Sequence, residues 1–118
     1  MRIPDLLWVL LYFEDGVWNA HALDLDLVGS GATASEAWEE LKDAIFTQLA
    51  FAIQNALVDS IERPAPKDYW ARLKDAEGLS ELDLVKGLDP KREYSMFVRL
   101  DDKEIHRAVT ETTFDRHA

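Results

Sequence analysis

The stretch from Leu6 to Leu23 constrains the fold more than any other, because it has the pattern of a β-hairpin. Residues 6–13, LLWVLLYF, form a continuous apolar run whose length is typical of a strand. Asp15-Gly16 follows, a dipeptide that readily takes the positive φ angles of a tight hairpin turn. Residues 17–23 then predict the returning strand, with its two faces formed by Val17, Asn19, His21 and Leu23 on one side and by Trp18, Ala20 and Ala22 on the other. The chain is therefore expected to open with an antiparallel pair.

The next segment, DLDLVGSGA, predicts a third, short strand. Leu25 and Leu27 are apolar, whereas Asp24 and Asp26 are expected to share the opposite face of this strand. Two glycines at its end, at positions 29 and 31, are expected to let the chain turn sharply.

A long helix is predicted directly after this turn. Thr33 and Glu36 have the spacing of a capping box, in which the Thr hydroxyl accepts from the amide of Glu36 and the Glu carboxylate reaches back to the amide of Thr33. The helix is expected to extend to about Leu57 or Val58. One apolar stripe with helical spacing is suited to packing on the sheet; its residues are Trp38, Leu41, Ile45, Leu49, Ala52 and Ile53.

A second apolar strip on the same helix predicts a second cover. It consists of Phe46, Ala50, Phe51 and Ala56. The cover could be the C-terminal half of the chain or a symmetry-related subunit, and the sequence leaves both open.

The C-terminal half predicts one short helix and at least one further strand. After the Pro64-Ala65-Pro66 connection, residues 68–76 have a helical pattern, with Asp68 as the expected cap and Gly78 as the expected end. Tyr69, Leu73 and Ala76 are expected to face inward. Residues 79–87 predict a loop or a helical turn, residues 93–100 a strand, and residues 101–118 either a short helix or a strand. Consecutive strands followed by a helix on one face indicate an α+β domain with an antiparallel sheet of the β-β-β-α-β type.

Composition places this fold in one globular domain without cysteine chemistry. The 118 residues are one domain's worth, 47% of them are hydrophobic, and no cysteine is present, which excludes disulfides and thiolate metal sites. The apolar run at residues 6–13 is too short to span a bilayer and is followed by Glu14-Asp15 instead of a cleavage site. A cytoplasmic protein is expected.

Charge is distributed unevenly along the chain. The net charge is −10, and residues 14–62 hold ten acids against one base, Lys42. Residues 63–118 are almost balanced, with twelve acids and eleven bases. An acidic half repels nucleic acid, whose binding needs cations, and attracts a basic partner. A well-solvated surface would explain the same pattern.

The order and spacing of these parts resemble those of the HicB-like antitoxins, which have a partial RNase H-like fold. The residues that carry the resemblance are Phe13-Glu14-Asp15-Gly16, Asp24 to Gly31 and Thr33-Ala34-Ser35-Glu36-Ala37, followed by Leu41 and Ala44-Ile45. On this basis residues 1–62 would be the HicB-like core and residues 63–118 a C-terminal extension. The resemblance implies a non-enzymatic antitoxin of a toxin–antitoxin system, which sequesters a small basic RNA-cleaving toxin of the HicA-like kind.

Members of this family that repress transcription also carry a C-terminal DNA-binding segment. Residues 96–109, MFVRLDDKEIHRAV, resemble the opening strand and first helix of a ribbon-helix-helix unit, but only nine residues follow and the segment is not strongly basic. DNA binding is therefore not expected. The chain is expected to form a homo-oligomer, most simply a dimer.

Other kinds of site receive less support from the sequence. Asp24 and Asp26 on an RNase H-like fold would be compatible with a two-metal nuclease site, but such a site needs further carboxylates that converge on the metal ions. His21 is expected to be a strand residue with a satisfied ring, and no cofactor, metal or catalytic residue is predicted. The residues expected to bind a basic partner are the acids Asp24, Asp26, Glu36, Glu39, Glu40 and Asp43. The alternative functions are an oligomeric regulatory protein without a toxin partner and, least favoured, a metal-dependent nuclease.

Overall fold

A computed structural model describes residues 6–55, 64–100 and 103 of the chain. The elements, in order, are β1 (Leu6–Glu14), β2 (Val17–Ala22), β3 (Leu27–Gly31), α1 (Ala34–Gln54), α2 (Lys67–Asp75), β4 (Glu77–Gly78), the 3₁₀ helix η2 (Glu81–Val85) and β5 (Tyr94–Arg99). The protein is an α+β domain, as predicted. One sheet has the strand order β3-β2-β1-β5-β4. All neighbouring strands are antiparallel except β4, which pairs with β5 in parallel.

The predicted hairpin is confirmed. Asp15 and Gly16 both have positive φ angles, 57° and 82°, so the turn between β1 and β2 is the tight kind that the dipeptide indicates. Register follows from this turn: Glu14 lies opposite Val17, and Val9 lies opposite Ala22. The alternation along β2 therefore divides the two faces of the sheet as expected.

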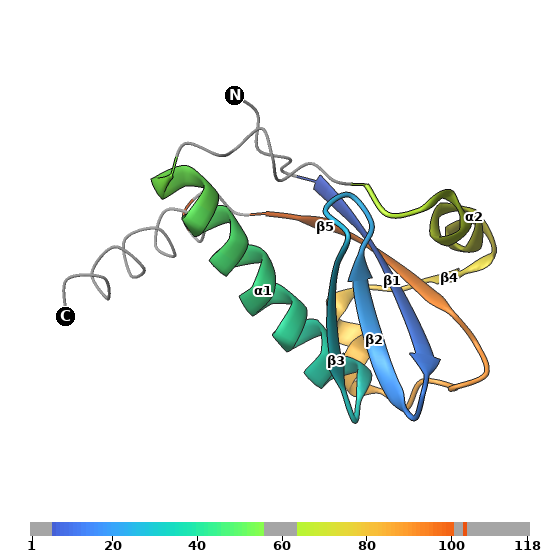
Figure 1. Ribbon diagram of the computed structural model, residues 1–118. Coiled ribbons are helices and arrows are strands. Elements are labelled where there is room, and N and C mark those ends of the chain that lie inside the picture. The colour runs from blue at the N-terminus through green and yellow to red at the C-terminus, as the bar shows by residue number, and fades with distance from the viewer. Residues whose placement is uncertain (1–5, 56–63, 101–102, 104–118) are drawn as a thin grey trace.

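Each face of the sheet has its own core (Figure 1). The larger core lies between the sheet and α1, with η2 contributing Leu84. The smaller core lies on the opposite face, where α2 packs Tyr69 and Leu73 against Leu10 and Tyr12. The sheet is thus a middle layer between α1 and α2.

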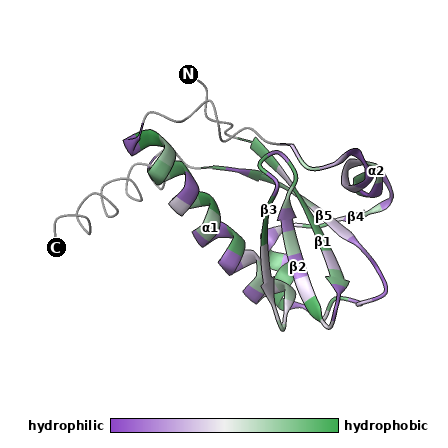
Figure 2. Ribbon diagram, viewed as in Figure 1, coloured by the Kyte–Doolittle hydropathy of each residue, from purple (hydrophilic) through white to green (hydrophobic). Residues whose placement is uncertain are grey.

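The apolar stripe predicted for α1 faces the sheet. Trp38, Leu41, Ile45, Leu49 and Ala52 are all buried, and Ile53 packs against the same core. Figure 2 shows the consequence as bands of hydrophilic and hydrophobic residues along the helix. In the second strip, Phe46 packs on the core and Ala50 is buried, whereas Phe51 is exposed. Ala56 lies outside the described residues.

Two glycines of β3 have a different role from the predicted one. Gly29 and Gly31 lie within the strand and have no positive φ angle, so they do not make a turn. They instead let α1 approach the strand closely: a Cβ on Gly29 would lie 2.3 Å from the backbone nitrogen of Leu41 and 2.5 Å from the carbonyl oxygen of Ala37. A methyl group at this position would overlap the helix backbone.

Three element boundaries also differ from those predicted. The helix α1 ends at Gln54, with Asn55 as its C-cap. The helix α2 has Pro66 in the N-cap position, where the side chain has no acceptor to offer, and Asp68 lies in the first turn. Its C-cap is Ala76, and Gly78 belongs to β4. The helix or strand expected in residues 101–118 and the helical part of the ribbon-helix-helix resemblance lie outside the described ranges, apart from Lys103.

Candidate functional site

Four carboxylates expected to bind a partner lie on the exposed side of α1. Glu36, Glu39, Glu40 and Asp43 are all solvent-exposed and occupy the first half of the helix. They are there because the apolar stripe at positions 38, 41 and 45 turns the intervening residues away from the sheet. The field of the helix favours negative charge near its N-terminus. The sequence therefore builds an acidic helix face, the name used below for these four residues.

Two members of the acidic helix face also hold the edge of the sheet. The Oε2 of Glu40 accepts from the amide of Ser30 at 3.3 Å, and the Oε2 of Glu36 accepts from the amide of Ala32 at 3.0 Å. The Thr33 hydroxyl accepts from the amide of Glu36 at 3.1 Å, as the capping box predicts, but the Glu36 carboxylate reaches Ala32 instead of Thr33. Because Ser30 belongs to β3, an outer strand, the bond from Glu40 occupies an amide that would otherwise face solvent.

The other two members leave more negative charge accessible. Glu39 forms an exposed ion pair with Lys42 at 3.0 Å, and pairs of this kind contribute little to stability. The Asp43 carboxylate has no ion pair or hydrogen bond among the described residues. Glu39 and Asp43 are thus the acids whose replacement disturbs the fold least.

Asp24 and Asp26 do not join the acidic helix face. They lie in the turn between β2 and β3, and not on a strand face as predicted, because β3 begins only at Leu27. Asp26 has a φ of 51°, a left-handed conformation that aspartate tolerates. The two groups of acids lie at opposite ends of β3 (Figure 1).

Both turn aspartates have intramolecular partners. The Oδ2 of Asp24 accepts from the amide of Trp8 at 2.7 Å, and the Oδ1 of Asp26 lies 2.7 Å from the Nε2 of His21. Their carboxylates therefore point in different directions and serve the hairpin and the turn. Within residues 6–55, 64–100 and 103, no three His, Asp or Glu side chains are grouped closely enough to hold a metal ion.

His21 belongs to a chain of polar contacts under α2. It is buried on β2, its Nδ1 lies 3.3 Å from the Tyr12 hydroxyl, and its ring packs edge-on against Tyr69 with centroids 4.6 Å apart. Its ring is satisfied at both nitrogens, as the sequence predicts. The prediction did not include the tyrosine neighbours, which come from a separate helix.

Arg72 attaches α2 to the same contacts. Its guanidinium lies over the rings of Tyr12 and Tyr69, 4.6 and 5.3 Å from their centroids, and it forms a two-bonded ion pair with Glu93. The hydrogen bonds to Glu93 raise the pKa of Arg72 further. Burial raises the pKa of Tyr12 to about 12, with the neighbouring Tyr69 adding to the effect. These contacts join α2 to the sheet.

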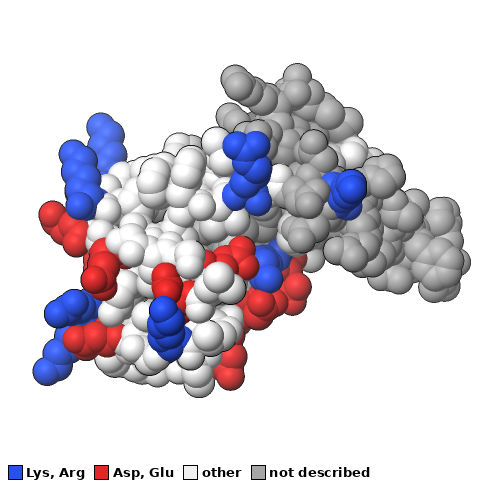
Figure 3. Space-filling model, turned by 180° about the vertical axis from the view of Figure 1, so that it is seen from behind, with Lys and Arg blue, Asp and Glu red and all other residues white. Residues whose placement is uncertain are grey.

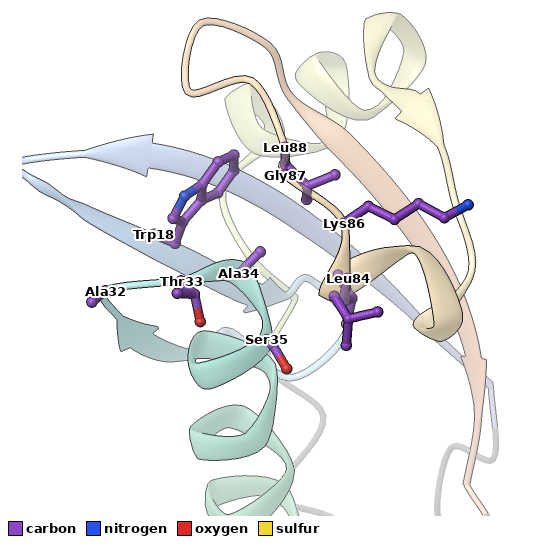
Figure 4. A pocket seen from close by; sticks show the side chains of 10 residues that line it. Trp18, Ala32, Thr33, Ala34, Ser35, Leu84, Lys86, Gly87 and Leu88 are labelled. Atoms are coloured by element: carbon purple, nitrogen blue, oxygen red, sulfur yellow. The ribbon is translucent and has the colours of Figure 1, made fainter.

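A cleft of about 440 Å³ lies between the start of α1, Trp18 and the segment after η2 (Figure 4). Lys86 is the ionisable residue among those that line it, and its ammonium is paired with Asp83 at 2.9 Å. The Thr33 hydroxyl at its rim is engaged by Glu36. The cleft therefore has space for a small group, but no histidine or carboxylate is among its lining residues to activate the Thr33 or Ser35 hydroxyl.

One exposed feature was not predicted from the sequence. Trp8 of β1 and Phe97 of β5 stack with ring centroids 4.3 Å apart, and their exposed fractions are 37% and 54%. Alternation within residues 6–13 and 94–99 gives each ring a face, but the pairing of β1 with β5 was needed to bring the rings together.

Comparison with known proteins yields no relative. No protein-family model matches the chain, and neither curated proteins nor solved structures give a match. Among the described helices, α1 included, none has the length and apolar character to cross a membrane.

Proposed function

We propose that this chain is a cytoplasmic, non-enzymatic binding module of the HicB-like type, whose acidic helix face engages a basic protein such as a small RNA-cleaving toxin. The observation that carries the proposal is the exposure of Glu36, Glu39, Glu40 and Asp43 together on one side of α1. Opposite charge on a partner would steer the encounter and raise the association rate.

The packing of α1 supports the proposal. Gly29 and Gly31 hold the helix against β3 without intervening side chains, and Glu36 and Glu40 bind backbone amides at the edge of the sheet. The acidic helix face is therefore presented on a rigid element, and binding would cost little ordering of the surface.

The test is copurification with the product of a neighbouring reading frame that encodes a small basic protein. The protein is expected to retain this partner at low salt and to release it at high salt, because exposed charge pairs are screened. If no basic protein copurifies, the toxin-binding proposal fails.

A pair of matched variants locates the contact. The double variant Glu39→Lys and Asp43→Lys reverses two charges on the acidic helix face without touching Glu36 and Glu40, which bind the amides of Ala32 and Ser30. The control, Asp68→Lys and Asp75→Lys, makes the same change in net charge on the exposed side of α2. We expect the first to weaken binding by about tenfold or more, a few kcal/mol at most, and the control to change it much less. Equal effects would show that only net charge matters.

A further inference from the structure

The outer edge of β5 is only partly covered. The short strand β4 pairs with Tyr94 and Ser95, and the Leu79 amide donates to the Ser95 carbonyl at 2.9 Å. Backbone groups in a strand alternate in direction, so those of Phe97 and Arg99 point to the same outer side as those of Ser95. Among the described residues, no strand pairs with this part of β5. We call it the open edge.

The open edge differs from the opposite edge of the sheet. On β3 the outward amide of Ser30 is occupied by Glu40, a carboxylate that blocks pairing with another strand. Among the described residues, no carboxylate accepts a hydrogen bond from the Phe97 or Arg99 amide of the open edge. On the α2 side of the sheet, the open edge instead carries the Phe97 ring, stacked on Trp8, and the exposed side chain of Arg99.

The surrounding surface is also suited to contact. Figure 3 shows the molecule from behind, so that parts far from the viewer in Figure 1 are near the viewer here. The upper part of this view is mostly uncharged but is interrupted by basic side chains, and charged side chains of both signs lie toward its left and lower parts. Leu6, opposite Arg99 in the ladder, is also exposed and adds to the apolar area.

We propose that the open edge pairs with the open edge of a second copy of this chain, in an antiparallel ladder in which Phe97 lies opposite Arg99 of the other copy. Such a ladder has a two-fold axis at Val98, so the pair occurs twice and the interface closes on itself. Leu79 and β4, beside Ser95, limit the ladder to residues 97–99.

The side chains fit this register. Directly opposite residues on one face of an antiparallel pair are in contact. Each Arg99 guanidinium would therefore lie beside the Phe97 and Trp8 rings of the other copy, an arrangement that cations and aromatic rings favour. The short ladder alone would contribute little net free energy, so these aromatic contacts must supply most of the affinity.

Two substitutions at one position test the register. Phe97→Lys and Phe97→Glu both remove the ring from Trp8, but they place opposite charges against Arg99 of the other copy. We expect the wild type to be a dimer by sedimentation velocity and native mass measurement. The dimer of Phe97→Lys should have a dissociation constant about tenfold or more above that of the Phe97→Glu dimer, because like charges directly opposite each other are unfavourable.

Net charge alone predicts the reverse order. The chain carries −10, so Lys reduces the general repulsion between copies and Glu increases it. Adding Arg99→Glu to Phe97→Lys should restore the dimer through two Lys–Glu pairs. Circular dichroism of every variant shows whether the monomer has remained folded.

Three results would overturn the proposal: a monomeric wild type at about 100 μM, well above a micromolar dissociation constant, equal affinities of the Lys and Glu variants, or failure of the double variant to reassociate. If a monomeric wild type still protects the Phe97 and Arg99 amides from hydrogen exchange, the edge is covered by another segment of the same chain. Loss of toxin binding would leave these results unchanged, because the acidic helix face is a separate surface.

Discussion

At the scale of single residues, Gly29 has the most exacting position in the described structure. A Cβ there would lie within 2.8 Å of three backbone atoms of α1, which cannot rotate away as a side chain would. We expect Gly29→Ala to lower the free energy of unfolding by about 1–3 kcal/mol, the usual cost of overpacking. The measurement is urea denaturation followed by circular dichroism.

Gly87→Ala is the matched control for this substitution. A Cβ at Gly87 meets nothing within 4 Å and its φ is not positive, so we expect a change of only a few tenths of a kcal/mol in either direction. Equal stability of the two variants would mean that α1 does not hold its close approach to β3.

The same residue shows where sequence reasoning reaches its limit. Glycine permits both a turn and a close backbone approach. A turn depends on the backbone angles of the glycine itself, whereas a close approach depends on another element that packs against it. Local signals were read correctly, as at Asp15-Gly16, where turn chemistry alone decides. At Gly29 the deciding contact is with Leu41 of α1. The sequence does not show where α1 crosses β3.

At the scale of elements, predictions were accurate where periodicity within one segment was sufficient. The hairpin, the stripe on α1, the helix near residues 68–76 and the strand near residues 94–99 are all present. The sequence did not indicate that β5 inserts beside β1, since Leu6 and Arg99 are far apart in the chain and pair only in the folded sheet. The stacked Trp8 and Phe97 and the docking contacts of Arg72 depend on such distant pairings.

The docking of α2 should depend on pH through Tyr12. Burial under this helix raises the Tyr12 pKa from 10.0 to about 12, so the folded protein holds the phenolic proton more tightly than the unfolded chain does. The stabilisation is complete below pH 10 and is lost as the pH rises toward 12. We expect the free energy of unfolding to fall across this interval, and less so in Tyr12→Phe.

The measurement is urea denaturation at a series of pH values, with absorbance titration of the tyrosines as a second readout. In the titration, one tyrosine of the wild type should ionise last, and Tyr12→Phe should lack that step. If the variant loses stability over the interval as steeply as the wild type, the coupling between Tyr12 and α2 is wrong.

At the scale of the whole molecule, the charge asymmetry should make stability depend on salt. Residues 14–62 carry ten acids and one base, and the described part of this segment folds into β2, β3 and α1, which pack on one another. Folding therefore brings like charges closer than they are in the unfolded chain, at a free-energy cost that screening reduces. Between about 10 mM and 150 mM NaCl the Debye length falls from roughly 30 Å to 8 Å, so we expect the unfolding free energy to rise with salt.

Asp43→Lys should flatten this dependence more than Asp75→Lys, because Asp43 lies on the acidic helix face and Asp75 lies beside Lys74 at the end of α2. Thermal unfolding at fixed pH over a salt series measures both slopes, and a stability that is flat or falls with salt would show that the asymmetry in sequence does not become an asymmetry in space.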